Sequence, residues 1–198
     1  MCQFIETIKV VDGKLFNLDF HQKRLNRTLN YFFNNKYQID LFQEISLPNL
    51  ALGTIFKLRI EYSKKINNVS ILPYKRKEIK TFQSVESNSI EYSFKFKNRE
   101  QINILKGNSS ADEIIIIKNG FVTDTSYSNI VFTDGYKLIT PNTPLLAGTK
   151  REFLLKEKLI EEDEIKLSDV KFFKHFYLIN SMLELTEENK YSIAQIHD

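Results

Sequence analysis

The sequence lacks most of the features that mark secreted, membrane and metal-binding proteins. Its 198 residues include one cysteine, Cys2, so neither a disulfide framework nor a clustered thiolate metal site is expected, and no metal is predicted. No apolar run approaches the roughly 20 residues of a membrane span. The N-terminus has no basic segment followed by an apolar one. These absences predict a cytoplasmic protein with no membrane partner.

Charge of one sign is also scarce. The 28 Lys and Arg residues nearly balance 25 Asp and Glu residues, which leaves a net charge of +3, and both signs are mixed along the chain. A nucleic-acid partner is therefore not expected. The densest basic stretch, residues 74–80, is interpreted as a solvated loop, with a cleft for a small anionic substrate as the alternative. Neither a Walker motif nor a dinucleotide fingerprint occurs.

The chain has enough apolar residues, 42%, to bury the core of one large domain or two small ones. The first half alternates between strand and helix patterns and indicates an α+β unit. A strand over residues 4–11 leads through the turn Asp12-Gly13 to a return strand over 14–16. The other elements expected here are a helix from the N-cap Asn17 to about residue 34, a short helix at 39–45, and strands at 54–62 and 69–74.

The second half follows a weakly patterned linker over residues 75–89. Its predicted elements are strands at 113–118, 128–133, 136–140 and 176–180 and a helix at 149–160. Because no repeat or low-complexity segment occurs, we expect two lobes, a smaller N-terminal domain over residues 1–85 and a larger C-terminal domain over 86–198. A small-molecule ligand would bind in a cleft between them.

Two basic clusters could carry chemistry. His21 and Arg24 lie three residues apart on one face of the first helix, where His21 is expected to pack in the core and Arg24 to meet an anionic partner. Strand-like alternation places Lys95 and Lys97 on one face of the segment that also contains Phe94 and Phe96. A lysine pressed against an apolar wall has a lowered pKa and becomes nucleophilic, whereas the alternative is an ordinary surface lysine.

A third cluster lies between Asn119 and Arg151. Asp124 is followed by polar or aromatic residues before an apolar run resumes, so it either forms an Asx turn or offers a carboxylate that could hold a protonated ring nitrogen. The segment then continues to Gly148-Thr149-Lys150 at a predicted helix start. Unpaired backbone N–H groups at such a start suit a phosphate.

Taken in this order, the clusters resemble the class IV aminotransferase family, the fold type IV enzymes that use pyridoxal 5'-phosphate. The opening segment looks like the family's N-terminal hairpin and H-x-x-R-L helix, which implies that Arg24 holds the cofactor phosphate. Residues 95–101 match the lysine segment of aminodeoxychorismate lyases. The resemblance therefore implies that Lys95, rather than Lys97, binds the cofactor as a Schiff base.

The third cluster resembles two further family segments. Asp124 stands where the family has the glutamate that pairs with the pyridine nitrogen, and it is followed at the matching distance by Asn129. The L-x-G-[IV]-x-R turn matches residues 146–151 and implies a phosphate cup that includes the backbone N–H groups of Thr149 and Lys150. A late turn around Ser181 resembles one that offers a further group to the phosphate or substrate. The cofactor-binding residues implied are Arg24, Lys95, Asp124, Asn129, Gly148, Thr149, Lys150 and Ser181.

The resemblance covers nearly the whole chain and implies a shortened, two-lobed, D-amino acid aminotransferase-like fold, with the lysine and the cofactor site in the larger domain. It also implies a homodimer and a small-molecule amino substrate. Thr7 matches a threonine of lyase members and is a catalytic candidate beside Lys95, while the pair Asn98-Arg99 likewise favours a lyase. Candidates for substrate binding are Lys57 and Arg59, which share a strand face, and Tyr127.

Three functions are consistent with the resemblance. The first is a lyase that converts 4-amino-4-deoxychorismate to 4-aminobenzoate and pyruvate, a step in making a folate precursor. The second is a class IV aminotransferase that acts on branched-chain or D-amino acids. The third is a family member that binds the cofactor, or nothing, without catalysis. Thr7 and the Asn98-Arg99 pair favour the first.

Overall fold

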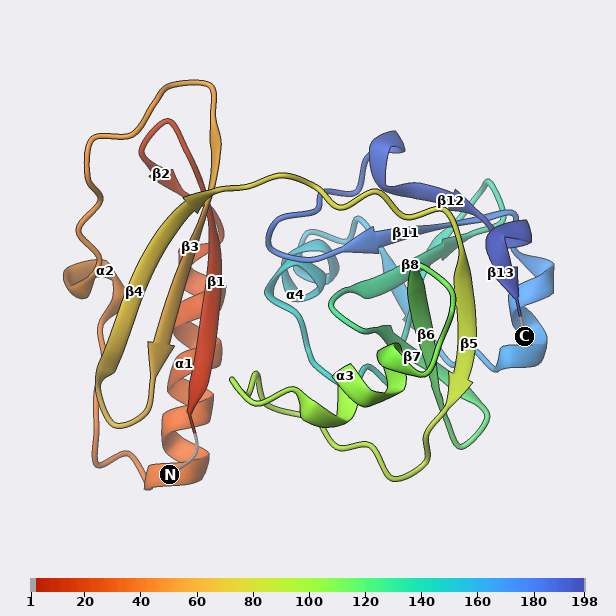
Figure 1. Ribbon diagram of the computed structural model, residues 1–198, viewed down its shortest axis with the longest axis horizontal. Coiled ribbons are helices and arrows are strands. Elements are labelled where there is room, and N and C mark those ends of the chain that lie inside the picture. The colour runs from red at the N-terminus through yellow and green to blue at the C-terminus, as the bar shows by residue number, and fades with distance from the viewer. Residues whose placement is uncertain (1–2, 198) are drawn as a thin grey trace. The chain divides into compact units, whose positions relative to one another are not determined.

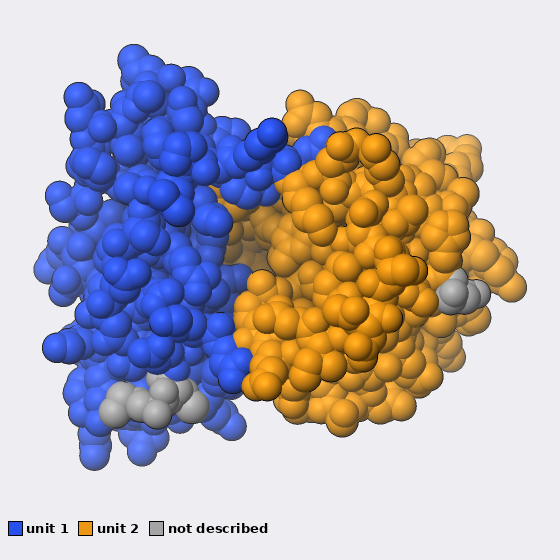
Figure 2. All heavy atoms as spheres, in the orientation of Figure 1, with its two compact units in different colours: residues 1–76, 94–98 blue, residues 77–93, 99–198 orange. Residues whose placement is uncertain are grey.

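The computed structural model describes residues 3–197, and the chain divides into two compact units (Figure 2). Unit 1 comprises residues 1–76 and 94–98, and unit 2 comprises residues 77–93 and 99–198. Cys2 lies outside the described residues. No helix among residues 3–197 has the length and apolar character needed to cross a membrane.

Unit 1 is a four-stranded antiparallel sheet with a long helix on one face (Figure 1). Its strands are β1 (Phe4–Val11), β2 (Lys14–Leu15), β3 (Ile55–Tyr62) and β4 (Ile66–Pro73), in the order β2-β1-β3-β4. Its helices are α1 (Leu18–Phe33) and α2 (Leu41–Glu44). The hairpin, both helices and both later strands of the sequence prediction are present. Asn17 precedes α1 as expected, but its backbone is left-handed and its side chain makes no capping hydrogen bond.

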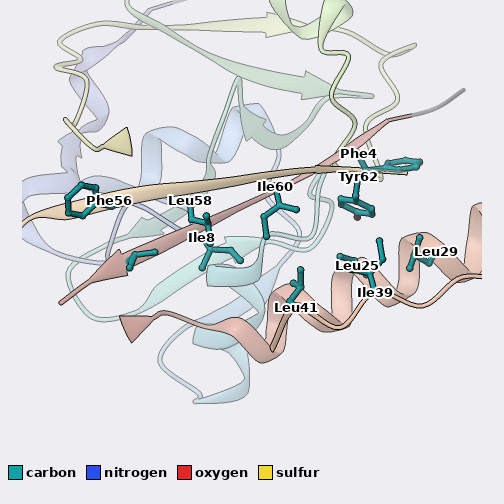
Figure 3. Close-up of a cluster of buried hydrophobic side chains, with 11 residues drawn as sticks. Phe4, Ile8, Leu25, Leu29, Ile39, Leu41, Phe56, Leu58, Ile60 and Tyr62 are labelled. Atoms are coloured by element: carbon teal, nitrogen blue, oxygen red, sulfur yellow. The ribbon is translucent and has the colours of Figure 1, made fainter. Parts of the chain in front are cut away.

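The two faces of this sheet differ because β1 and β3 alternate in register. Glu6 pairs with Ile60, so the even-numbered positions of both strands share the face that packs on α1. Apolar side chains from β1, β3, α1 and the segment around α2 meet there (Figure 3). The odd-numbered positions form the opposite face, on which Thr7 lies opposite Arg59 and Lys9 lies opposite Lys57.

Residues 94–98 return to unit 1 because they pair with β1. Phe96 forms an antiparallel bridge with Phe4, the Ile5 N–H donates to the Lys95 carbonyl at 3.0 Å, and the Lys97 N–H donates to the Gln3 carbonyl at 2.8 Å. The rings of Phe94 and Phe96 pack against the apolar core of the unit. The backbone of Lys95 is thus held by a strand and by two aromatic neighbours.

Unit 2 contains two sheets (Figure 1). The first has the order β13-β5-β6-β7 and the second the order β10-β9-β8-β11-β12. Its strands are β5 (Phe82–Glu86), β6 (Glu113–Lys118), β7 (Phe121–Thr125), β8 (Asn129–Thr133), β9 (Leu138–Pro141), β10 (Glu161–Asp163), β11 (His175–Ile179), β12 (Lys190–Ser192) and β13 (Ile196–His197). Its helices are α3 (Glu100–Gly107) and α4 (Thr149–Lys156), with three short 3-10 helices at Leu167–Phe172, Glu187–Asn189 and Ile193–Gln195.

The units depart from the expected division at residue 85 in two ways. Strand β5, which lies within the stretch expected to be a linker, pairs in parallel with β6, and this pairing assigns residues 77–93 to unit 2. Lys95 belongs to unit 1 rather than to the larger unit because of the bridge to Phe4. Helix α3 was not expected, and α4 ends at Lys156, before residue 160, because Lys158 turns left-handed with a φ of 56°.

Candidate active site

A buried carboxylate joins the two basic residues of α1 inside unit 1. Glu6 accepts hydrogen bonds from Arg24 Nε at 2.9 Å and Arg24 Nη2 at 2.5 Å, and His21 Nδ1 lies 2.6 Å from Glu6 Oε2. Glu6 and His21 are fully buried and Arg24 is 4% exposed. The bidentate arrangement is the geometry in which a guanidinium binds a carboxylate best. The anionic partner expected for Arg24 is therefore present within the protein.

The ionisation of this trio follows from its contacts. Burial acts to raise the pKa of Glu6, but the charge of Arg24 and hydrogen bonds from His21 and Arg24 outweigh it and lower the pKa to about 2. Burial lowers the pKa of His21, and together with the charges of Arg24 and Lys95 it outweighs the hydrogen bond and the charge of Glu6, which act to raise this pKa. Glu6 is thus an anion that can only accept, and a neutral His21 donates its Nδ1–H to it.

Sequence reasoning identified the basic residues of this trio but not Glu6. The available signal was a lone carboxylate at a position that alternates with Phe4, Ile8 and Val10, all of which are buried. The ion pair with Glu6 stabilises Arg24 in the buried position, and the role of Arg24 toward a cofactor phosphate stays a prediction.

Lys95 lies on the face of unit 1 that also carries Thr7. Because Phe96 is directly opposite Phe4 and points into the core, Lys95 and Lys97 are on the other face, together with Thr7 and Arg59. The predicted alternation of this segment is therefore observed. Lys97 is 41% exposed and pairs with Glu61 at 2.6 Å, whereas Lys95 is half-buried.

The substrate candidates of unit 1 lie on this face as well. Arg59 donates from Nε to Glu61 Oε1 at 3.1 Å, and Lys57 lies two residues before it on β3. Glu61 therefore accepts from both Arg59 and Lys97. With Thr7 and Lys95, this face combines cationic groups suited to a carboxylate with a hydroxyl and a half-buried amine.

In unit 2, Asp124 is a strand residue whose carboxylate is buried. It lies in β7, is 5% exposed, and accepts from Asn129 Nδ2 at 2.7 Å and from the Leu146 N–H at 2.9 Å. Burial raises the pKa of Asp124 to about 6, although the hydrogen bonds from Leu146 and Asn129 and the charge of Arg151 act to lower it. A backbone hydrogen bond from Leu145 also acts to lower this pKa.

The pKa of Asp124 makes stability depend on pH in a defined direction. A carboxyl group with a raised pKa in the folded state contributes stability below its unfolded pKa of 3.8, and this contribution is lost as pH rises through about 6. Relative to Asp124→Asn, the wild-type protein should lose roughly 2 kcal/mol of unfolding free energy between pH 4 and pH 7. Urea unfolding of both proteins across this range measures the difference in their unfolding free energies. A difference that does not change with pH would contradict the raised pKa of Asp124.

The side chain of Thr125, rather than that of Asp124, forms the hydrogen bonds of the turn that follows β7. Thr125 Oγ1 accepts from the Ser128 N–H at 3.0 Å and the Tyr127 N–H at 3.4 Å, so the Asx turn considered for Asp124 is not formed. The Tyr127 carbonyl accepts from Asn180 Nδ2 at 3.3 Å. This bond brings the late turn that contains Ser181, a half-buried residue, to the same bend.

The start of α4 is fitted closely to Asn129. Asn129 Nδ2 also donates to the Leu146 carbonyl at 2.9 Å, and a Cβ at Gly148 would lie 2.0 Å from Asn129 Oδ1. Thr149 and Lys150 are buried, and the Lys150 ammonium pairs with Glu184. The phosphate cup implied by the sequence uses the backbone N–H of Lys150, whereas its ammonium is directed to Glu184.

Replacing Gly148 by alanine should destabilise unit 2. Its φ of −73° suits any residue, so the expected effect arises from the overlap with Asn129, which would have to give up its bonds to Asp124 and Leu146. We expect a loss of about 1–3 kcal/mol in unfolding free energy. Gly107→Ala is the matched control, because a Cβ there meets nothing within 4 Å. Equal effects of the two substitutions would refute the role assigned to Gly148.

The chain belongs to the family whose model is described as Amino-transferase class IV, which matches residues 3–187. The resemblance and the fold expected from the sequence are thereby confirmed. A protein of Haemophilus influenzae strain Rd, described as uncharacterized, is 40% identical over 185 residues, which cover 92% of this chain and 98% of that protein.

Two solved structures show the same fold. One, from Haemophilus somnus 129PT and named a "putative 4-amino-4-deoxychorismate lyase", is 30% identical with a TM-score of 0.80, and the match covers 93% of this chain and 98% of that one. The other is the PLP-bound form of "a hypothetical aminotransferase" from Mycobacterium tuberculosis, with a TM-score of 0.70 over 98% of this chain and 81% of that one. At 16% identity, the second likeness shows the fold alone.

Proposed function

We propose that the protein is a pyridoxal-phosphate-dependent lyase that converts 4-amino-4-deoxychorismate to 4-aminobenzoate and pyruvate. The observation that carries the proposal lies in unit 1, where Thr7 and Lys95 share one face of the sheet and the backbone of Lys95 is fixed against β1. The likeness to the Haemophilus somnus protein, which covers nearly all of both chains, supports the same choice.

The residues present suit the cofactor. Asp124 offers a buried carboxylate, which would hold a protonated ring nitrogen. The N-terminal N–H groups of α4 and the Ser181 hydroxyl would serve the phosphate, as would Arg24, whose Nε and Nη2 already bind Glu6. Lys95 would bind the cofactor covalently. Once bound, pyridoxal phosphate supplies an electron sink for a carbanion next to the substrate nitrogen.

The residues of unit 1 would perform the proton transfers. Lys95 would remove the proton from the ring carbon that carries the amino group. The bond between the ring and the enolpyruvyl oxygen then breaks, the ring becomes aromatic, and the released enolpyruvate takes up a proton to give pyruvate. Lys57 and Arg59 would hold a substrate carboxylate, and the Thr7 hydroxyl lies on the same face.

The experiment that tests this function supplies 4-amino-4-deoxychorismate to the protein loaded with pyridoxal phosphate. Equal amounts of 4-aminobenzoate and pyruvate are expected. The competing function is the transamination that the family's description names, and it predicts amino-group exchange with branched-chain or D-amino acids instead. Exchange without 4-aminobenzoate would reject the lyase proposal, and binding of the cofactor with neither reaction would favour a non-catalytic family member.

A further inference from the structure

A polar hollow lies within unit 2. It has a volume of about 520 Å³, and its lining includes the cationic residues Lys77, Arg99 and Lys106 together with Ser109, Glu113 and Tyr127. Asp124, Asn129 and Gly148 are not part of this lining. Among the residues assigned above to substrate or cofactor, Tyr127 is the only one that contributes to it.

Helix α3 contributes part of this lining. Arg99 is the N-cap residue of the helix, and Asn103 and Lys106 follow at intervals of four and three residues, so all three share one side. Ile102, at the edge of the same side, is 3% exposed and packs with Ile114 in an apolar cluster. The packing of Ile102 therefore anchors α3 beside the hollow.

The cations of the hollow retain donors for a ligand. Lys106 Nζ donates to the Ala111 carbonyl at 2.8 Å, Lys77 Nζ donates to the Asp112 carbonyl at 2.7 Å, and Arg99 Nη2 donates to the Ser126 carbonyl. An ammonium has three N–H groups and a guanidinium has five, so each cation has donors beyond these bonds. The carbonyl partners are neutral, and the carboxylate of Asp112, which lies outside the lining, acts through its charge on Lys77.

The only carboxylate in the lining, within residues 3–197, is already engaged. Glu113 is 1% exposed, and its Oε1 accepts from the Ile114 N–H at 2.9 Å and the Ser126 N–H at 3.1 Å. Three cationic side chains against this single carboxylate leave an excess of two positive charges in the lining. Such an excess suits a ligand with two negative charges.

We propose that this hollow is a second binding site, for a small dianionic oxyanion of the phosphate or dicarboxylate class. Arg99 and Glu113 hold the carbonyl and the N–H of Ser126, two residues after Asp124 in the chain. A ligand that binds Arg99 would therefore influence the conformation of the bend between β7 and β8. The site does not depend on the proposed lyase reaction.

The test titrates inorganic phosphate, and malonate in a separate arm, into the full chain without pyridoxal phosphate, and follows the backbone amide resonances of isotope-labelled protein. Saturable shifts are expected at Ser109, Ser126 and Tyr127. Lys106→Ala should weaken binding about tenfold. Lys118→Ala is the matched control, because Lys118 also donates to a backbone carbonyl, that of Ile90 at 2.8 Å, but lies outside the lining. It should change the affinity less than about twofold.

Each outcome decides the proposal. Saturable binding of either probe with loss in Lys106→Ala alone supports the site, and the tighter probe identifies the ligand class. Shifts confined to Thr149 and Lys150 at the start of α4, or equal losses in the two variants, would overturn it. Because no enzyme activity is measured, these results are independent of the lyase assay.

Discussion

Replacing Lys95 by alanine is expected to abolish both the formation of 4-aminobenzoate and the visible absorbance of the lysine-bound cofactor. The substitution removes the only group proposed to attach the cofactor and to move the substrate proton, so the rate should fall by at least about 10³-fold. The fold should survive, because the Lys95 backbone and the rings of Phe94 and Phe96 hold this segment against unit 1. Absorbance spectroscopy and product analysis of the purified variant measure both effects.

Lys97→Ala is the matched control for this result. Lys97 lies on the same segment and face, but it is 41% exposed and pairs with Glu61. This variant should keep the cofactor absorbance. If the absorbance survives in Lys95→Ala, or is lost only in Lys97→Ala, the cofactor is not attached to Lys95.

The second large effect is expected on stability. Replacing Glu6 by glutamine removes the anion that neutralises Arg24 in the core of unit 1 and leaves a buried guanidinium without its charge partner. Breaking a buried ion pair in this way typically reduces stability by about 3–5 kcal/mol. Urea unfolding at neutral pH measures the loss.

Glu61→Gln provides the comparison within the same sheet. Glu61 also pairs with an arginine and a lysine, but on the exposed face, where solvent screens the charges. Its replacement should therefore have a much smaller effect. If Glu6→Gln and Glu61→Gln reduced the free energy of unfolding equally, burial of the trio would make no additional contribution to stability.

The effect of Glu6→Gln on stability should also depend on pH. Because the pKa of Glu6 is lowered to about 2 in the folded state, its contribution to stability is complete above the unfolded pKa of 4.5 and is lost as pH falls toward 2. The difference between wild type and Glu6→Gln should therefore shrink below pH 4.5. A difference that grows on acidification would contradict the assigned ionisation.

Local patterns predicted the elements of unit 1 well because their signals are short-range. The turn Asp12-Gly13 adopts positive φ at both residues, 49° and 73°, and α1 follows the apolar spacing of its sequence. Strand β5 was missed because its residues, Phe-Gln-Ser-Val-Glu, carry no strong alternation, and it forms through pairing with β6. The residues of β5 by themselves do not indicate this pairing.

The candidate site likewise combines features that the sequence indicated with contacts that only the tertiary fold reveals. Lys95 and Asp124 were proposed from their neighbours in the chain, and their roles stay predictions; the bridge between Phe96 and Phe4 agrees with the alternation expected around Lys95. Two contacts depended on the tertiary fold instead. Glu6 meets Arg24 across 18 residues of chain, and Asn129 approaches Gly148 so closely that a side chain cannot fit. Neither distance follows from spacing alone.

The central claim is that this class IV family member works through pyridoxal phosphate bound to Lys95. The most direct measurement is reduction of the cofactor-loaded protein with borohydride, which fixes the cofactor to the amine that holds it, followed by mass analysis of its peptides. The account predicts the pyridoxyl group on Lys95 and an unmodified Lys97. A label on any other lysine, or no label after loading with the cofactor, would contradict it.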